Sequence, residues 1–269
     1  MPFIHINDID LHYQSIRAFR GKPTMVFSNS LGTDFRIWQD VIALLEGEVG
    51  VVAYDKRGHG LSEATPAPYS IDDHVGDLAG LLDYLGVSNA VVCGLSVGGI
   101  IAQGLYQARP DLVQALILSD TGYKVGAPEL WKTRIEQAEK GGLEPMADAI
   151  MERWFSEEFR LSKKAELTGY RNMLVQQSVA GYSGTTAVLR DVDFTETVGQ
   201  IAVPTLCIVG DQDLATPPEL VKSLSERIPG AQYEIVAGAG HLPCVEKPYE
   251  FVTLVREFLA NLTDETIYD

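Results

Sequence analysis

Short apolar runs without polar alternation are the feature that most constrains the fold of this 269-residue chain. They are rich in β-branched side chains, which is typical of strands buried on both faces of a parallel sheet. The runs are TMVFS (24–28), GVVAYD (50–55), AVVCGL (90–95), ALILSD (115–120), TLCIVG (205–210) and YEIV (233–236). Helical patterns lie between them, and one begins at Ser70, a candidate N-cap. This alternation predicts an α/β fold with a mostly parallel, doubly wound sheet and right-handed crossovers.

Two segments depart from this alternation. Residues 3–16 alternate polar and apolar side chains around Asn7-Asp8, which predicts an antiparallel hairpin at the sheet edge. Residues 122–193 contain no run typical of a buried strand, but their apolar residues have helical spacing. We therefore expect an α/β core of residues 1–121 and 194–269, with a helical cap inserted at 122–193.

Composition narrows the class of partner. The 37 acidic and 21 basic residues give a net charge of −16, which repels nucleic acid and anionic membranes. The three cysteines form no paired motif, and no apolar run has membrane length, so we expect a cytoplasmic protein without disulfides. The five histidines lack metal-ligand spacing. These features disfavour nucleic-acid and membrane partners, we expect no metal or other cofactor, and the oligomeric state is not indicated.

The string GLSVGG at residues 94–99 is the most informative motif for chemistry. It fits the pattern G-x-S-x-G, with a strand-like run before it and a helical pattern after it. In this context Ser96 is a candidate nucleophile on a sharp strand-to-helix turn. The backbone N–H of Val97, at the start of the helix, is then a candidate donor to an oxyanion. A tight turn with an ordinary serine is the alternative.

The partners of such a serine follow in the order acid, then histidine. Asp211 and Asp213 both end a late apolar run, and we assign the acid to Asp213, leaving Asp211 to hold the turn. His241 follows a loop of small residues after the last strand-like run, so it can lie between Asp213 and Ser96. The remaining histidines are interpreted as structural or solvated: His5, His12, His59 and His74.

Motifs along nearly the whole chain resemble the α/β-hydrolase superfamily. They are YDKRGHGLS (54–62), GLSVGG (94–99), GDQDLATPP (210–218) and GAGHLPCVEKP (238–248). A closer similarity is to the 3-oxoadipate enol-lactonases, which act in the β-ketoadipate pathway of bacterial aromatic degradation. It is carried by FSNSLGTDFRIW (27–38), YDKRGHGLS, PELWKTR (128–134) and ERWFSEEF (152–159). The superfamily usually has His-Gly where this chain has Asn29-Ser30 in the turn after the first strand-like run.

This resemblance implies hydrolysis of 3-oxoadipate enol-lactone to 3-oxoadipate by Ser96, His241 and Asp213. It further implies that the backbone N–H groups of Leu31 and Val97 hold the oxyanion. The lactone carries a carboxylate, and a cation must therefore meet it in spite of the net negative charge.

Arg134 in the expected cap is our candidate for that cation, with Trp131 and Trp154 as apolar walls. Exposure of Arg134 on a helix, and packing of both tryptophans between cap and sheet, are the alternatives. Lys124 is a weaker candidate cation, and Arg57 is interpreted as structural.

Other activities remain open on the same residues. A carboxylesterase, or a cofactor-free haloperoxidase or perhydrolase, would use the same serine, histidine and acid. A ligand-binding receptor on this fold can also retain them. Dehalogenases and epoxide hydrolases are disfavoured because they need aspartate where this chain has Ser96.

Overall fold

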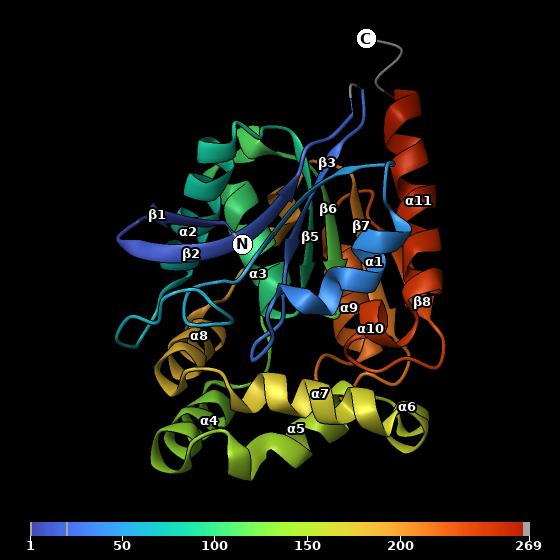
Figure 1. Cartoon of the computed structure of the whole chain (residues 1–269). Helices are drawn as coiled ribbons and strands as arrows, with labels where there is room; N and C mark the ends of the chain where they lie inside the picture. Colours follow the sequence, from blue (N-terminus) through green and yellow to red (C-terminus); the bar gives the residue numbers. More distant parts are fainter. Residues whose placement is uncertain (1, 20, 266–269) are drawn as a thin grey trace.

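The computed structural model describes residues 2–19 and 21–265, which form one sheet flanked by helices (Figure 1). The strands are β1 (Phe3–Ile6), β2 (Ile9–Ile16), β3 (Thr24–Ser28), β4 (Gly50–Tyr54), β5 (Ala90–Leu95), β6 (Val113–Ser119), β7 (Thr205–Gly210) and β8 (Gln232–Val236). Their order is β1-β2-β4-β3-β5-β6-β7-β8. β1 and β2 form the predicted antiparallel hairpin, β2 is antiparallel to β4, and the other neighbours are parallel. The predicted α/β fold is confirmed.

Helices connect the parallel strands. They are α1 (Gln39–Leu44), α2 (Ile71–Leu85), α3 (Val97–Ala108), α4 (Pro128–Gly141), α5 (Ala147–Trp154), α6 (Glu157–Ser162), α7 (Lys164–Val175), α8 (Val179–Asp191), α9 (Pro218–Arg227), α10 (Pro243–Glu246) and α11 (Pro248–Glu265). Short 3-10 turns are η1 (Phe35–Trp38), η2 (Pro110–Leu112), η3 (Glu144–Met146) and η4 (Val198–Gln200). Ser70 caps α2 in a reciprocal capping box with Asp73, as its position in the sequence predicted. Within the described part of the chain, no helix is both long and apolar enough to cross a membrane.

Both faces of the sheet are covered, which explains why the strand sequences do not alternate. Phe27 of β3 packs in the same cluster as Phe251 of α11. Its neighbour Val26 points the other way and packs in a second cluster with Leu78 of α2 and Leu105 of α3. Since successive residues of a strand face opposite sides, each central strand needs apolar residues at every position.

Strand β8 is an exception to the predicted burial. Its sequence YEIV suggested a strand buried on both faces, but most of β8 is exposed, and Ile235 is 50% exposed. β8 pairs with β7 and ends the sheet order, so part of it faces solvent. The prediction was wrong because a short apolar run does not reveal whether its strand has a neighbour on each side.

Helices α4 to α8 all lie between β6 and β7 in the chain. In Figure 1, α4 to α7 lie beyond one end of the sheet rather than against either of its faces. Trp131, Ile150, Trp154 and Leu174 from these helices belong to the same apolar cluster as strand residues of the core. The described structure has no strand in residues 122–193, and the division into core and cap at those limits stays a prediction.

A buried ion pair ties the loop after β4 to helix α2. Arg57 donates two hydrogen bonds of 2.6 Å to the carboxylate of Asp77, and the two side chains are only 7% and 1% exposed. Burial raises the pKa of Asp77, and the guanidinium of Arg57 opposes that rise. This contact agrees with the structural interpretation of Arg57.

Removing one member of this pair should destabilise the fold. Arg57→Met leaves Asp77 buried without its cation, and we expect the free energy of unfolding in urea to fall by ~3–5 kcal/mol. The double variant Arg57→Met/Asp77→Leu should recover part of that loss. Arg109→Met, which breaks exposed pairs with Asp83 and Asp111, is the control and should have a much smaller effect. Equal losses for the buried and exposed variants would contradict this interpretation.

Candidate active site

Ser96 lies at the turn between β5 and α3, in a backbone conformation that side-chain-bearing residues rarely adopt. Its φ is 59° and its ψ is −120°. The two flanking glycines make this turn possible. A Cβ atom on Gly98 would lie 2.1 Å from the carbonyl oxygen of Ser28, and one on Gly94 would lie 2.3 Å from that of Gly98. The turn is fixed on β6 by the N–H of Ser96, which donates to the carbonyl of Ser119 at 3.0 Å.

Asp213 and His241 form a buried pair. His241 Nδ1 lies 2.8 Å from Asp213 Oδ2, and the side chains are 2% and 0% exposed. The N–H groups of Ala215 and Thr216 donate to Asp213 Oδ1 at 2.7 and 3.1 Å, and the Thr216 hydroxyl donates to Oδ2 at 2.6 Å. Burial disfavours ionisation of Asp213, but His241 and these donors outweigh it and lower its pKa. An ionised Asp213 therefore holds the His241 ring in one orientation.

Asp211, the other acid considered at this strand end, has a different contact. Its Oδ1 accepts a 2.7 Å hydrogen bond from the N–H of Gly238 in the loop after β8. This contact holds the turn, as the sequence interpretation expected. Thr216, which braces Asp213, was not identified from the sequence, although it lies three residues after the proposed acid in a Pro-rich turn.

Ser96 and His241 line one narrow cavity of about 30 Å³ between the sheet and helices α4, α5 and α8. That space holds about one water molecule. The other lining residues are Ser30, Leu31, Trp131, Arg134, Ile150, Arg153, Trp154, Tyr182, Leu189 and Ala215. The structure thus brings Ser96, His241 and Leu31 together with all three proposed substrate-binding residues, while Val97 follows Ser96 directly at the start of α3.

The turn after β3 lines this cavity and leaves one of its backbone N–H groups without a protein acceptor. The N–H of Gly32 donates to His59 Nε2 at 3.0 Å, and the N–H of Thr33 donates to the carbonyl of Ser30 at 3.3 Å. The N–H of Leu31 has no acceptor within the described residues. That of Val97 lies in the first turn of α3, where helical N–H groups lack intrahelical acceptors. The two N–H groups that the sequence predicted as oxyanion donors are therefore not used by intrahelical or turn hydrogen bonds in the described structure.

His59 is buried, and its Nε2 accepts the hydrogen bond from Gly32 in this turn. The sequence interpretation of His59 as structural or solvated did not include this contact. That contact was missed because nothing in the sequence relates residue 59 to residue 32.

Two arginines line the cavity without an acidic partner. Neither Arg134 nor Arg153 has a carboxylate within 4 Å in the described part of the chain. The Arg134 guanidinium lies 5.4 Å from the ring centre of Trp131. Burial and the neighbouring Arg134 lower the pKa of Arg153, while the more distant charge of Asp213 acts in the opposite direction. Arg134 is thus not simply an exposed helical charge, and the cavity contains a second cation.

Arg153 was missed as a site residue, although it precedes Trp154 in the ERWF motif that carried part of the resemblance. Lys124, the weaker candidate, is exposed and pairs with Asp193 at 2.7 Å.

The loop that carries His241 is attached to the end of helix α5. The N–H of His241 donates to the carbonyl of Trp154 at 2.9 Å. The carboxylate of Glu246 accepts hydrogen bonds from the N–H of Gly240 at 2.8 Å and from the hydroxyl of Ser156 at 2.5 Å. Trp154 therefore has two roles in the structure, because its ring lines the cavity and its carbonyl positions the histidine backbone.

Asp120, at the end of β6, is a second buried acid in the site. It accepts hydrogen bonds from Gly210 N at 2.9 Å and from the Ser119 hydroxyl at 2.5 Å. Burial, followed by the charge of Asp213, raises the pKa of Asp120 well above its ordinary range. The neutral carboxyl group is favoured there. Asp120 was not predicted as a site residue, although its place at the carboxyl end of a parallel strand was a usable signal in the sequence.

Asp120, Asp213 and His241 have potential ligand atoms within 4.8 Å of one another. The sequence predicted no metal site. The hydrogen bonds that Asp213 already accepts, including that from His241 Nδ1, match a catalytic acid–histidine pair better than a set of metal ligands.

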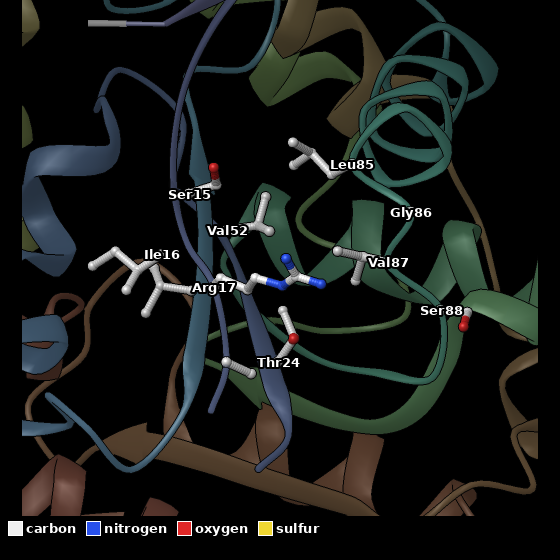
Figure 2. Close-up of a pocket in the computed structure, with 11 residues that line it drawn as sticks. Ser15, Ile16, Arg17, Thr24, Val52, Leu85, Gly86, Val87 and Ser88 are labelled. Atoms are coloured by element: carbon white, nitrogen blue, oxygen red, sulfur yellow. The ribbon is translucent and has the colours of Figure 1, made fainter. Parts of the chain in front are cut away.

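A larger groove of about 540 Å³ lies elsewhere on the molecule, as Figure 2 shows. It runs between the end of β2, where Arg17 projects, and residues 85–88, which are the last residue of α2 and the three that follow it. Thr24 in its wall begins β3, which places the groove at the amino ends of the parallel strands. Its described lining includes no histidine, cysteine or carboxylate, whereas the narrower cavity contains both Ser96 and His241.

The sheet order, the serine turn and the acid–histidine pair together define an α/β hydrolase. Residues 23–248 match the family model for the alpha/beta hydrolase fold, and the chain belongs to this family of hydrolases. It is 32% identical to 3-oxoadipate enol-lactonase 2 of Acinetobacter baylyi, over 93% of this chain and 96% of that protein. The resemblance inferred from the motifs is thereby confirmed.

Two further relatives show the range of the similarity. The crystal structure of the enol-lactonase from Burkholderia xenovorans LB400 superposes with a TM-score of 0.92 at 34% identity, covering 96% of this chain and 100% of that one. The putative carbamate hydrolase RutD of Pantoea ananatis is 27% identical over 88% of both chains. The comparisons therefore establish the hydrolase family, and the relatives within it are named for different substrates.

Asp120→Asn should reproduce the neutral form of this acid. Because the folded-state pKa of Asp120 is raised, its contribution to stability is present below the ordinary carboxyl pKa of about 4 and is lost as the pH rises through the elevated value. The wild type should thus lose stability between about pH 4 and the raised pKa of Asp120, whereas Asp120→Asn has no such loss. The unfolding free energy of Asp120→Asn minus that of the wild type should therefore increase with pH over that range. Urea titrations at several pH values measure it. Asp191→Asn, at an exposed acid with a lowered pKa, is the control and should show no such gain. A difference independent of pH would contradict a neutral Asp120.

Proposed function

We propose that this protein hydrolyses 3-oxoadipate enol-lactone to 3-oxoadipate through a covalent acyl–serine intermediate. The observation that carries the proposal is the pair of arginines without an acidic partner, Arg134 and Arg153, beside Ser96 and His241 in a chain of net charge −16. Charged guanidinium groups that line a cavity without a directly paired carboxylate are costly, and an anionic substrate supplies such a partner. The similarity to enol-lactonases indicates which anion this is.

In the first half of the reaction Ser96 Oγ attacks the lactone carbonyl carbon, and its proton passes to His241 Nε2. Asp213, held at Nδ1, stabilises the imidazolium that forms. The carbonyl oxygen becomes an oxyanion, which receives hydrogen bonds from the N–H groups of Leu31 and Val97. The bond from the carbonyl carbon to the ring oxygen then breaks, and the ring oxygen takes the proton from His241.

The second half releases the acid. The ring oxygen leaves as an enol, a better leaving group than an alkoxide, and the enol tautomerises to the ketone. Water gives a proton to His241 as its oxygen attacks the acyl carbon, and Ser96 recovers its proton when the second tetrahedral intermediate collapses. Each half uses the same oxyanion donors and the same histidine, so a single fixed site serves both.

The cap supplies recognition of the substrate carboxylate. Arg134 can offer two parallel N–H groups to a carboxylate, which a lysine cannot do. Trp131 and Trp154 then provide apolar walls for the ring. The present cavity of about 30 Å³ is smaller than such a lactone, so the proposal requires the side chains of the cap to shift when substrate enters.

Hydrolysis of an uncharged ester or a carbamate is the second candidate. Trp131, Ile150 and Leu189 give the cavity a largely apolar wall, and the similarity to the putative carbamate hydrolase RutD points the same way. Initial rates on the enol-lactone, a short-chain neutral ester and a carbamate separate the candidates, because only an enol-lactonase should favour the anionic lactone.

Ser96→Ala tests the nucleophile. Removing Oγ should reduce kcat on the enol-lactone by roughly 10⁶-fold if the reaction is covalent. The far-ultraviolet circular dichroism spectrum should stay unchanged, since alanine fits the same turn. Ser30→Ala, at another serine of the cavity, is the comparison and should retain most of the activity. Turnover by Ser96→Ala near the wild-type rate would show that Ser96 is not the nucleophile.

Arg134→Ala tests the carboxylate contact. We expect kcat/KM on the enol-lactone to fall by roughly 10- to 100-fold, the value of a charge-assisted hydrogen bond, and kcat/KM on a neutral ester to change little. Lys132→Ala removes an exposed cation from the same helix and controls for the overall charge. An equal loss on the lactone and on the neutral ester would rule out Arg134 as the carboxylate partner.

A further inference from the structure

Lys56 is a fully buried amine directly beneath the turn that carries Leu31. Lys56 lies two residues after the end of β4 in the chain, and it is 0% exposed. Nζ donates to the carbonyl oxygen of Ser30 at 2.6 Å and to that of Thr33 at 3.3 Å. No carboxylate of the described residues lies within 4 Å of it. Burial lowers the pKa of Lys56 to about 7, although nearby acids act in the opposite direction.

The turn does not need Lys56 to satisfy its backbone. The carbonyl of Ser30 also accepts a hydrogen bond from the Thr33 hydroxyl at 2.9 Å and from the Thr33 N–H at 3.3 Å. The carbonyl of Thr33 also accepts one from the side-chain amide of Asn29. Burying an amine in this place therefore costs stability without filling an empty hydrogen-bonding position. Groups retained at such a cost are typical of functional sites.

The bond to Ser30 has a direct geometric consequence for the proposed oxyanion donor. The carbonyl of Ser30 and the N–H of Leu31 belong to one planar peptide group, in which C=O and N–H point in opposite directions. Holding the oxygen toward Lys56 directs the N–H away from it. Ser30 and Leu31 line the cavity that contains Ser96, and the Leu31 N–H has no acceptor among the described residues.

The same bond also strengthens that donor. The protonated amine on the carbonyl oxygen draws electron density through the peptide and makes its N–H more positive, as happens in hydrogen-bonded chains. This effect belongs to the charged form of Lys56 and weakens as the pH rises through its pKa of about 7. The next peptide is fixed independently, because the N–H of Gly32 donates to His59 Nε2. The charge of Lys56 is among the causes that lower the pKa of the buried His59, and the neutral ring keeps the acceptor that Gly32 needs.

We propose that Lys56 is a positioning residue of the oxyanion hole, which orients and polarises the Ser30–Leu31 peptide for the transition state. The proposal rests on the serine mechanism given above, but it does not depend on which ester or lactone is the substrate. It assigns the effect to kcat, because the oxyanion forms only after the substrate has bound.

Lys56→Met removes the cation and keeps a side chain of similar length. With p-nitrophenyl acetate as a neutral substrate, kcat should fall by roughly 10- to 100-fold, less than for complete loss of an oxyanion donor, and KM should change less than about threefold. The inhibition constant of phenylboronic acid, which forms a tetrahedral adduct on the serine, should rise by a similar factor. The thermal midpoint should be equal to or above that of the wild type, since the buried amine is gone.

Thr33→Val removes a neutral donor to the same carbonyl with little change of shape, and a smaller fall in kcat is expected. Lys222→Met, at an exposed lysine of α9, controls for the loss of one positive charge and should leave kcat unchanged. Two results would overturn the proposal: a Lys56→Met variant with kcat within twofold of the wild type, or one whose activity is lost through a lowered thermal midpoint. If Ser96→Ala stayed active, the serine mechanism itself would fail, which is distinguishable from either result.

Discussion

The backbone of Ser96 is the constraint on which the rest of the site depends. A non-glycine residue at φ 59° and ψ −120° is strained, and its neighbours compensate through close packing. Gly98, in the first turn of α3, lies against the carbonyl of Ser28 at the end of β3. That approach places the turn carrying Leu31 beside the first turn of α3. One strained residue thus juxtaposes a hydroxyl group and two backbone donors.

The two buried acids of the site have different charge states, and its cations lie in two separate places. Asp213 is ionised because several donors meet it, whereas Asp120 is favoured in its neutral form by burial and by the charge of Asp213. The cations are arranged around the cavity in two places. Arg134 and Arg153 belong to the helices between β6 and β7, and Lys56 lies beneath the turn after β3. In our proposal the first group binds the substrate and the second supports its transition state.

The sequence was sufficient for the fold because nearly every central strand is apolar on both faces, and the serine turn has its own glycine pattern. It was also sufficient to select Ser96, Asp213 and His241 as candidates, since each follows a recognisable strand. It could not reveal contacts between distant segments. In the sequence Lys56 is one of several charged residues in YDKRGHG, and only the structure shows that its amine donates a hydrogen bond to the carbonyl of Ser30.

The exposed strand β8 illustrates the same limit. The apolar run that predicts a strand does not say which strands lie beside it, and burial depends on those neighbours.

The central claim is that the site recognises an anionic lactone. It is tested most directly by comparing the enol-lactone with its methyl ester, in which the ring is unchanged and the carboxylate is neutral. Initial rates of ring opening by the wild-type protein give kcat/KM for each compound. We predict that the free carboxylate is preferred by roughly 10- to 100-fold, the worth of its charge-assisted hydrogen bonds. Equal rates, or a preference for the methyl ester, would contradict the claim.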